Sequence, residues 1–339
     1  MKSYGVAIWG AGWVAGEHVR AYRNNPNCRL VAVGSRTLEG ARAKAAQWGL
    51  DCPVYDNLGA MLANADVDIV SICTPNNQHA RDVVACAQAG KHILVEKPPA
   101  IELESLRAMR AAVRQAGVKT LVGFVLRWNP LLQTIKALLD DGALGRIVLA
   151  QLDYWHHISR ADQLPMYHWL VQRDKAGSIF LAGGSHAVDA ARWFIGDEVA
   201  EVFGYSTAPT GDYEYAPTTI AMLRFASGTI ANISASVEAH IPYVFNIDLL
   251  GEDGSLRGNR LYSKKLPGQR DWAIIPTILP DSGDVSHHPF QGEIDHFVDC
   301  IINNVESPLN LESGAKTTEV CLAVDLSAAE GRPVQLPLI

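Results

Sequence analysis

Residues 4–15, YGVAIWGAGWVA, decide the expected fold of this chain. The apolar run VAIW is typical of a buried strand, and the glycine-rich turn after it leads into a segment with helical spacing. Gly10, Gly12 and Ala15 form the pattern GxGxxA at that junction. The first glycine of such a turn permits the sharp bend, the second lets the backbone approach a pyrophosphate, and the helix N-terminus offers unpaired amides. The stretch therefore predicts a dinucleotide-binding βαβ unit.

The alternation of strand and helix continues to about Val125. Strand-like runs and helical segments follow each other at 30–33, 38–48, 68–73, 80–90, 92–96, 102–117 and 119–125. Strands that alternate with helices indicate a parallel sheet. We therefore expect a doubly wound Rossmann domain at residues 1–125.

The pattern changes in residues 126–339, which we expect to form a second, α+β domain. A helix-like segment at 130–142 is followed by longer β-rich runs with turn signals such as SG and DG between them. These runs lie at 146–157, 218–226, 228–239 and 243–254. Successive strands with tight turns indicate an antiparallel sheet. Apolar spacing predicts further helices at 292–302 and 317–331.

Length and charge narrow the class of protein. A chain of 339 residues exceeds the size at which one core usually keeps growing, which again favours two domains. With 48% hydrophobic and 19% charged residues, the composition is that of an ordinary globular protein. The net charge of -7 argues against nucleic acid as a partner, because such binding relies on clustered Lys and Arg. Small molecules are the expected partners.

Cysteine usage and the N-terminus bear on location. The 6 cysteines are scattered, with no CxxC pair, which favours a reducing compartment. The N-terminus lacks the basic start and long apolar region of a signal peptide, and no uncharged apolar run approaches the roughly 18 residues of a membrane span. We expect a cytoplasmic protein without membrane contact.

The end of the second predicted strand bears on which dinucleotide binds. NAD sites commonly place Asp or Glu there for the ribose hydroxyls, whereas this chain has Gly34, Ser35 and Arg36. A hydroxyl followed by a guanidinium suits a 2′-phosphate, because Arg offers a planar fork of donors. NADP is favoured on this ground, and NAD stays open because Arg36 is equally readable as an ordinary surface arginine.

Two later strand ends point at the same cofactor. CTPNNQH, 73–79, and VEKPP, 95–99, each follow a strand, and ligands of open α/β sheets bind beyond the carboxyl ends of the strands. The expected cofactor-binding residues are Gly10, Gly12, Trp13, Val14, Ser35, Arg36, Thr74, Pro75, Asn76, His79, Glu96 and Lys97. The Lys97 ammonium can also hydrogen-bond a substrate hydroxyl and lower its pKa.

GAGWVAG, CTPNNQH, VEKPP, RWNP and GSHAVD together resemble the glucose-fructose oxidoreductase / inositol dehydrogenase (Gfo/Idh/MocA) family, in order and over nearly the whole chain. The resemblance implies a Rossmann domain followed by a domain with a large open sheet, and homodimers or homotetramers formed through that sheet. It also implies hydride exchange between a nicotinamide ring and a carbinol carbon, usually of a sugar or cyclitol.

Oxidation of CH–OH to C=O needs a base within hydrogen-bond reach of the hydroxyl, and histidine titrates in the useful range. The resemblance assigns this role to His186. The acidic residue that many members carry four positions earlier is Ala182 here. Either another group or water fills that gap beside Lys97 and His186, or the chemistry differs. Asp189 either orients the imidazole or the helix start, or it pairs with Arg192.

Substrate contacts are expected from polar and aromatic residues of the second domain, because aromatic faces bind the C–H surfaces of sugars and polar groups address the hydroxyls. The candidates are Arg127, Trp128, Asn129, Tyr154, His156, His168, Trp169 and Lys175, beside Lys97 and His186. A metal site is disfavoured, because the adjacent pairs His156–His157 and His287–His288 point different ways on a strand.

Three functions remain in competition at this point. The first is an NADP- or NAD-dependent dehydrogenase or reductase of a sugar, sugar acid or cyclitol. The second retains the nicotinamide through each turnover and epimerises, eliminates or hydrolyses at a neighbouring carbon, an alternative raised by Ala182. The third is a non-catalytic dinucleotide or sugar sensor, against which the presence of both Lys97 and His186 argues.

Overall fold

The computed structural model describes residues 3–338 except 163, 165 and 281–284. Its first sheet has 6 parallel strands in the order β3-β2-β1-β4-β5-β6. The strands are β1 (Tyr4–Trp9), β2 (Cys28–Gly34), β3 (Val54–Tyr55), β4 (Ile69–Ile72), β5 (His92–Glu96) and β6 (Thr120–Gly123). The helices between them are α1 (Ala15–Asn24), α2 (Leu38–Gln47), α3 (Leu58–Leu62), α4 (Asn76–Gln88) and α5 (Leu103–Ala116). This strand order is that of a doubly wound Rossmann fold, as the sequence predicts.

The turn after β1 needs glycine for two independent reasons. Gly10 has a φ of 97°, in the region that L side chains rarely adopt. A Cβ placed on Gly10 would also lie 2.5 Å from the backbone carbon of Cys73, at the end of the neighbouring β4. The bend therefore brings the backbones of these two strand ends together at the carboxyl edge of the sheet.

The second sheet has 9 strands in the order β14-β13-β12-β11-β7-β10-β9-β8-β15. They are β7 (Ile147–Trp155), β8 (Val199–Ser206), β9 (Thr218–Phe225), β10 (Ile230–Ser236), β11 (Val244–Gly251), β12 (Gly254–Arg257), β13 (Arg260–Ser263), β14 (Ala273–Ile274) and β15 (Val334–Gln335). The sheet is antiparallel as predicted except between β7 and β10, which run parallel. Strands β10 and β11 run in opposite directions and lie on either side of β7. One of the two must therefore run parallel to β7, and it is β10.

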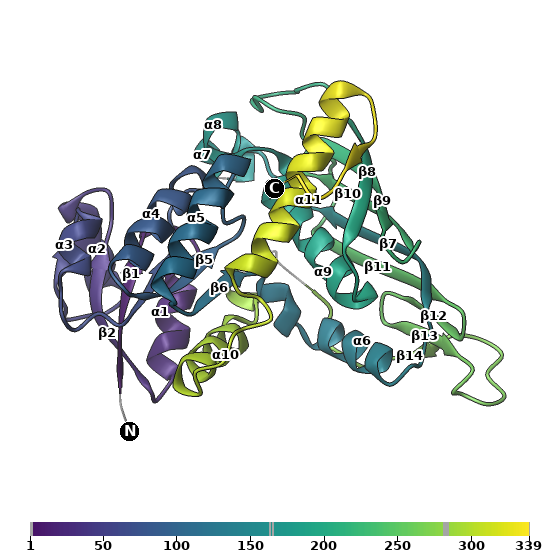
Figure 1. The fold of residues 1–339 in the computed structure, drawn as a ribbon, viewed down its shortest axis with the longest axis horizontal. Coiled ribbons are helices and arrows are strands. Elements are labelled where there is room, and N and C mark those ends of the chain that lie inside the picture. The colour runs from purple at the N-terminus through teal and green to yellow at the C-terminus, as the bar shows by residue number, and fades with distance from the viewer. Residues whose placement is uncertain (1–2, 163, 165, 281–284, 339) are drawn as a thin grey trace.

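Helices from the rest of the chain cover one face of this sheet or lie at its junction with the first sheet, except α10, which packs beside α1 (Figure 1). They are α6 (Pro130–Asp140), α7 (Tyr167–Leu170), α8 (Arg173–Ala176), α9 (Ser185–Ile195), α10 (Phe290–Ile302) and α11 (Leu311–Glu330). A π-helical turn, Phe180–Gly184, leads directly into α9. Short 3₁₀ turns lie at Val125–Trp128, Arg160–Asp162 and Val285–His287.

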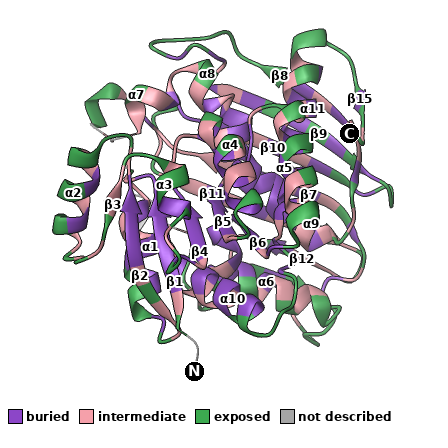
Figure 2. Ribbon diagram, turned by 60° about the vertical axis from the view of Figure 1, so that its left-hand side comes forward, coloured by how far each residue is buried: buried purple, intermediate pink, exposed green. Residues whose placement is uncertain are grey.

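The chain returns to the first sheet after completing most of the second. Phe290, Ile294 and Phe297 of α10 are buried in the same core as the strands of the Rossmann sheet. Asn25, at the end of α1, donates to Asp295 at 2.7 Å. Division of the chain at Val125 remains our prediction for the domains. It separates the two sheets, but it assigns α10 to the second domain although that helix packs in the core of the first sheet. Figure 2 shows the strands of the first sheet buried beneath helices whose outer faces are exposed, whereas strands of the second sheet such as β9 alternate between buried and exposed residues.

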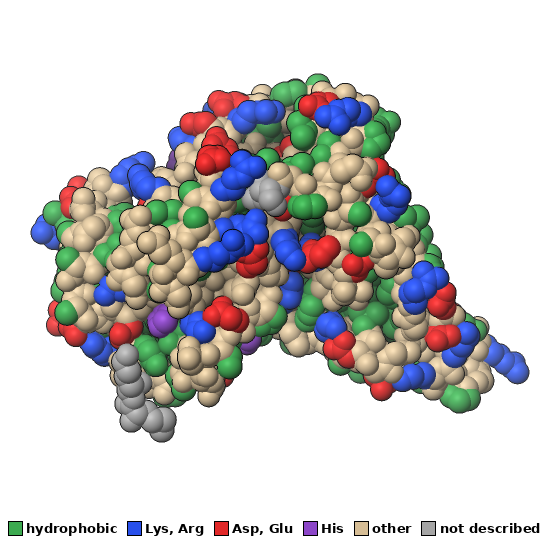
Figure 3. All heavy atoms as spheres, viewed as in Figure 1, with side chains coloured by type: hydrophobic (Ala, Val, Ile, Leu, Met, Phe, Trp, Pro, Cys, Tyr) green, Lys and Arg blue, Asp and Glu red, His purple; other side chains and the backbone are tan. Residues whose placement is uncertain are grey.

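The described residues include no helix that is both long and apolar enough to cross a membrane. On the face shown in Figure 3, Lys and Arg side chains are interspersed with Asp and Glu. Mixed charge of this kind produces no extended field of one sign on that face.

Candidate active site

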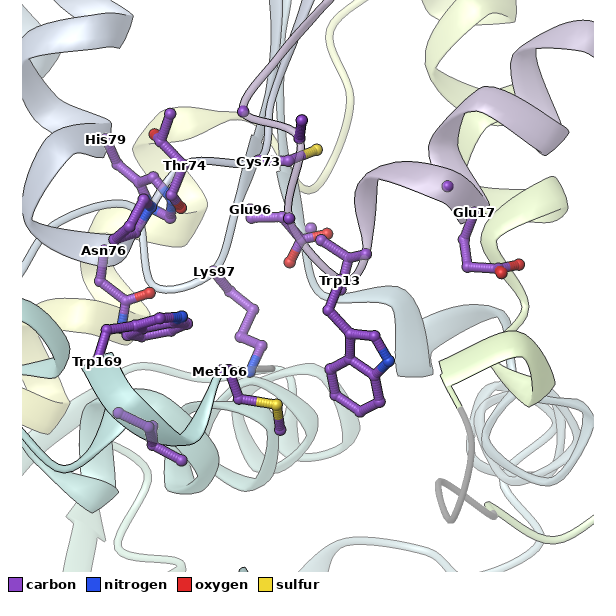
Figure 4. A pocket seen from close by; sticks show the side chains of 18 of the residues that line it. Trp13, Glu17, Cys73, Thr74, Asn76, His79, Glu96, Lys97, Met166 and Trp169 are labelled. Atoms are coloured by element: carbon purple, nitrogen blue, oxygen red, sulfur yellow. The ribbon is translucent and has the colours of Figure 1, made fainter. Parts of the chain in front are cut away.

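A cavity of about 1460 Å³ opens at the carboxyl ends of the Rossmann strands and extends to the second sheet. Its cofactor end is lined by residues 9–14, 16 and 17 and by the ends of β2, β4 and β5. The opposite wall comes from the segments at 154–158, 166–170 and 179–186. Figure 4 shows Trp13, Lys97, Met166 and Trp169 converging on this space. The site therefore lies where both halves of the chain meet, as the strand ends predict.

The residues present fit a dinucleotide at the first end. Helix α1 begins without a side-chain cap, so its first amides are open to a pyrophosphate at the turn of Gly10 and Gly12. All the residues predicted to hold the cofactor line the cavity, namely Gly10, Gly12, Trp13, Val14, Ser35, Arg36, Thr74, Pro75, Asn76, His79, Glu96 and Lys97. Those residues would hold the cofactor's phosphates, ribose and nicotinamide.

Two of these side chains brace the site. The fully buried His79 ring lies between backbone carbonyl oxygens, with Nδ1 2.7 Å from Pro98 and Nε2 2.7 Å from Thr74. Asn76 donates from Nδ2 to the carbonyl of Ala176 at 3.1 Å, which joins the start of α4 to α8 across the two halves. Their polar atoms therefore hold the strand-end loops in place.

Lys97 contacts the chain at Ala182, the position at which the expected carboxylate is missing. Its Nζ donates to the backbone carbonyl oxygen of Ala182 at 2.7 Å. Burial lowers the pKa of Lys97, and the charge of Glu96 opposes that effect. A main-chain oxygen thus contacts the ammonium at the position where the family resemblance leads one to expect an acidic side chain.

The π-helical turn is what presents this carbonyl. Such turns are rare and concentrate at functional sites, because they redirect backbone groups out of the regular helical ladder. Ser178 holds the start of the turn: its hydroxyl donates to the part-buried Asp325 of α11 at 2.7 Å and accepts from the Leu181 amide at 3.1 Å. Burial raises the pKa of Asp325 to about 7. The turn is therefore anchored from behind by α11.

His186 follows the turn as the second residue of α9, and 6% of its surface is exposed. Its ring is stacked on Tyr154 at 6.1 Å between centroids, and Phe124 meets it edge-on at 6.0 Å. Among the described residues, Nδ1 has no hydrogen-bond partner. Burial and the neighbouring charges of Lys97 and His288 hold the pKa of His186 well below its ordinary value. The imidazole is therefore neutral at neutral pH and able to accept a proton.

Gly183 makes room for that stacking. A Cβ on Gly183 would lie 2.5 Å from a ring carbon of Tyr154, so a side chain at this position would displace the tyrosine that packs on His186. Burial raises the pKa of Tyr154 to about 12, so the phenol stays protonated. Tyr154 also packs edge-on against His156 at 6.5 Å. Gly183, Tyr154 and His186 therefore form one packed unit.

The structure brings Tyr154, His156, His168 and Trp169 to the cavity wall with Lys97 and His186. It does not bring Arg127 there, which is a correction to the expected substrate wall. The Arg127 guanidinium is buried and makes a two-pronged ion pair with Asp189 at 2.8 and 2.9 Å. Asp189 therefore neither orients the imidazole nor pairs with Arg192, because its ion-pair partner is Arg127.

Asn129 is a second correction. Its side chain accepts from the Leu131 amide at 2.9 Å and so caps the start of α6. Trp128 and Lys175, like Asn129, are not among the residues that line the cavity. A motif such as RWNP marks a tight structural junction as readily as a substrate contact, and the sequence alone does not separate the two.

Several cavity residues carried no signal in the sequence. Met166, Ile158 and His288 line the cavity from connecting segments that match no motif. His18 was also missed. It is fully buried on α1 and lies 2.9 Å from Glu96, and its only sequence signal is a histidine one turn into the helix that follows the glycine-rich turn.

Comparison with known proteins places this geometry in a family. A family model described as an oxidoreductase family with NAD-binding Rossmann fold matches residues 4–124. A second model, the GFO/IDH/MocA C-terminal domain, matches residues 132–257. The chain belongs to the Gfo/Idh/MocA oxidoreductases. The family resemblance and the fold expected from the motifs are therefore confirmed.

Relatives in this family cover most of the chain. Inositol 2-dehydrogenase of Rhizobium meliloti (strain 1021) is 31% identical over 74% of this chain and 73% of that protein. The scyllo-inositol 2-dehydrogenase (NAD(+)) of Bacillus subtilis (strain 168) is 27% identical over 92% of this chain and 90% of that protein. The crystal structure of aldose-aldose oxidoreductase from Caulobacter crescentus, complexed with glycerol, is 26% identical, covers 99% of this chain and 100% of that one, and has a TM-score of 0.83.

Proposed function

We propose that this Gfo/Idh/MocA oxidoreductase transfers a hydride between a nicotinamide dinucleotide and a carbinol carbon of a sugar or cyclitol, with Lys97 and His186 handling the hydroxyl proton. The observation that carries the proposal is the placement of an ammonium and a neutral imidazole in one cavity with an uncapped helix N-terminus. The relatives named above act on an inositol or an aldose by their names.

The proposed division of labour follows from charge and proton state. The dinucleotide, when bound, supplies the hydride acceptor or donor. The Lys97 ammonium hydrogen-bonds the substrate hydroxyl and stabilises developing negative charge on its oxygen. The neutral His186 accepts the hydroxyl proton in oxidation and returns it in reduction. Tyr154, His156, His168 and Trp169 provide the walls that bind the C–H faces and hydroxyls of the ring.

The first test is a panel of cyclitols and aldoses with NAD⁺ and NADP⁺, followed at the absorbance of the reduced nicotinamide. Substrate-dependent reduction of either dinucleotide is expected. Absence of turnover in both directions with every substrate would overturn the proposal and favour a sensor. Product formation without net change in the dinucleotide would favour the epimerase, lyase or hydrolase alternative, whose main support, Ala182, is weakened by the Lys97 contact with the Ala182 carbonyl.

NADP is the proposed preference within this dinucleotide site. Ser35 and the exposed Arg36 both line the cavity at the end of β2. Arg36→Ala is expected to weaken NADPH binding by about 1.5–3 kcal/mol, the range of a charged hydrogen bond, and to leave NADH binding nearly unchanged. Titration of both reduced dinucleotides into both proteins measures the difference. Equal losses for NADPH and NADH would rule out a 2′-phosphate contact.

A homodimer or homotetramer formed through the second sheet is also proposed. Helices α9 and α11 cover one face of that sheet, while Ile220, Met222 and Ile230 are 43%, 45% and 41% exposed on the other. Neighbouring apolar side chains of this kind mark an interaction surface. The paired change Ile220→Asp and Met222→Asp is expected to yield monomers by light scattering. The control is Ile302→Asp on α10, where Ile302 is likewise 43% exposed and the oligomer should persist. An unchanged mass in the paired variant would exclude this face.

The cytoplasm remains the proposed location. All 6 cysteines are free thiols in the structure, which suits a reducing compartment.

A further inference from the structure

A buried polar cluster lies directly beneath the glycine-rich turn, outside the wall that faces substrate. The His18 side chain, on α1, is fully buried. Its Nδ1 lies 2.7 Å from the hydroxyl of Ser71 in β4, and its Nε2 lies 2.9 Å from a carboxylate oxygen of Glu96 at the end of β5. Both ring nitrogens are therefore committed to side chains of the central strands.

Glu96 connects this cluster to the cavity. It lines the cavity and precedes Lys97, which also lines it. In Figure 4 the Glu96 side chain extends toward Trp13 and the Lys97 side chain toward Met166. The carboxylate is confined on its other side by β6, because a Cβ on Gly123 would lie 3.2 Å from Oε1. His18 and the β6 backbone thus hold the carboxylate between them.

The other groups around the pair come from β4, α4 and α10. Cys73 faces His18 from the end of β4, the Phe290 ring lies 5.1 Å from the His18 ring, and Glu293 approaches from α10. Glu293 is fully buried, and neither of its oxygens has a hydrogen-bond partner among the described residues. Burial and the charge of Glu96 raise the pKa of Glu293 well above its ordinary value, so that carboxyl is neutral.

The groups whose charges act on Glu96 are His18, Lys97 and, from α4, His79. Burial opposes the ionisation of Glu96, but the hydrogen bond and charge of His18, followed by the charges of Lys97 and His79, lower its pKa overall. Burial likewise opposes charge on His18, yet Cys73 and Glu96 raise its pKa well above the ordinary value. At neutral pH the pair is ionic.

We propose that His18 is a positioning residue, which keeps the Glu96 carboxylate charged and in place as the counter-charge of Lys97. Lys97 needs such support because burial disfavours its ammonium, and Glu96 is the neighbour that opposes this effect. The importance of that ammonium for catalysis rests on the proposed function. Its protonation state is measurable without turnover.

The test is the pH dependence of acetylation of Lys97 by acetic anhydride in the dinucleotide-free protein, followed by mass spectrometry. Glu96→Gln is expected to lower the midpoint by about 1 unit, because an opposite charge at close range shifts a pKa by about that much or more. Lys97 would then react about tenfold faster below the midpoint. His18→Gln is expected to lower the midpoint by a smaller, still measurable amount, because it loosens and partly neutralises Glu96 rather than removing it. The double variant should match Glu96→Gln alone, since His18 acts through Glu96.

Controls separate this role from simple support of the fold. His296→Gln makes the same replacement at a half-buried histidine of α10 that contacts Ser307 at 3.0 Å, and it should leave the Lys97 midpoint unchanged. Lys91 serves as the internal standard in every sample. If His18→Gln does not fold, Glu96→Gln and His18→Asn carry the test, and both must shift the midpoint.

An unchanged Lys97 midpoint in folded Glu96→Gln, or a shift there but none in a folded His18 variant, would overturn the proposal. A shifted midpoint in a protein that turns over no sugar or cyclitol would leave the His18 role intact and overturn the proposed function instead. Where turnover is observed, the alkaline limb of kcat/KM should move in the same direction as the labelling midpoint.

Discussion

His186→Asn is expected to lower kcat by about 10²–10⁴-fold, the range typical of loss of a general base. Asparagine fills similar space against Tyr154 and Phe124, whose rings lie 6.1 and 6.0 Å from that of His186. It cannot accept a proton at neutral pH. Steady-state rates and dinucleotide titration together measure the effect, and the Kd of the dinucleotide should change little because His186 lies in the opposite wall of the cavity.

The wild-type pH profile gives this prediction a second readout. A lowered pKa keeps the imidazole in its basic form to more acidic pH. Oxidation should therefore hold its rate below the ordinary histidine pKa of about 6.5 and fall only further into acid. The acid limb should disappear in His186→Asn. A variant with normal kcat would remove His186 from the chemistry.

Lys97→Met is expected to cause a loss of similar size in kcat/KM and to change the pH profile as well. Methionine retains the chain length but cannot donate to a hydroxyl or to the Ala182 carbonyl. The positive charge of Lys97 also lowers the pKa of His186, so its removal should raise that pKa. The acid limb of oxidation by the residual activity should therefore move to higher pH.

Lys91→Met is the matched control for this change. Lys91 is also part-buried and also donates to a backbone carbonyl, that of Val67 at 2.7 Å, but it does not line the cavity. Its replacement should lower stability without altering kcat or the acid limb. Equal effects of the two methionine variants on rate would show that Lys97 supports the fold rather than the reaction.

The sequence predicts best where a residue type is dictated by the backbone. The Gly10 turn is readable because a φ of 97° and a Cβ clash at 2.5 Å leave glycine as the one residue that fits. The sequence also predicts that Thr74 and Lys97 lie close together in the cavity, because the carboxyl ends of parallel strands meet at one edge of the sheet. These features follow from local pattern and topology, which a linear sequence contains.

Side-chain partnership was far less predictable. Arg127 pairs with Asp189, 62 residues away, and His18 pairs with Glu96, 78 residues away. Whether an arginine contacts a substrate or a buried carboxylate depends on how the helices pack. The spacing of residues along the sequence does not determine that packing. The role of the Ala182 carbonyl could not be predicted for another reason. The family resemblance indicates that a carboxylate is missing at Ala182, but the sequence does not show that a π-helical turn presents a main-chain oxygen in its place.

The central claim, hydride transfer from a carbinol carbon, is tested most directly by isotope transfer. Cyclitols and aldoses deuterated at their carbinol carbons are incubated with the protein and oxidised dinucleotide, and the reduced dinucleotide is analysed by mass spectrometry. Deuterium should appear in the dinucleotide in proportion to ketone formed, and Lys97→Met and His186→Asn should slow both together. Conversion of the labelled sugar with no deuterium ever entering the dinucleotide would contradict the account.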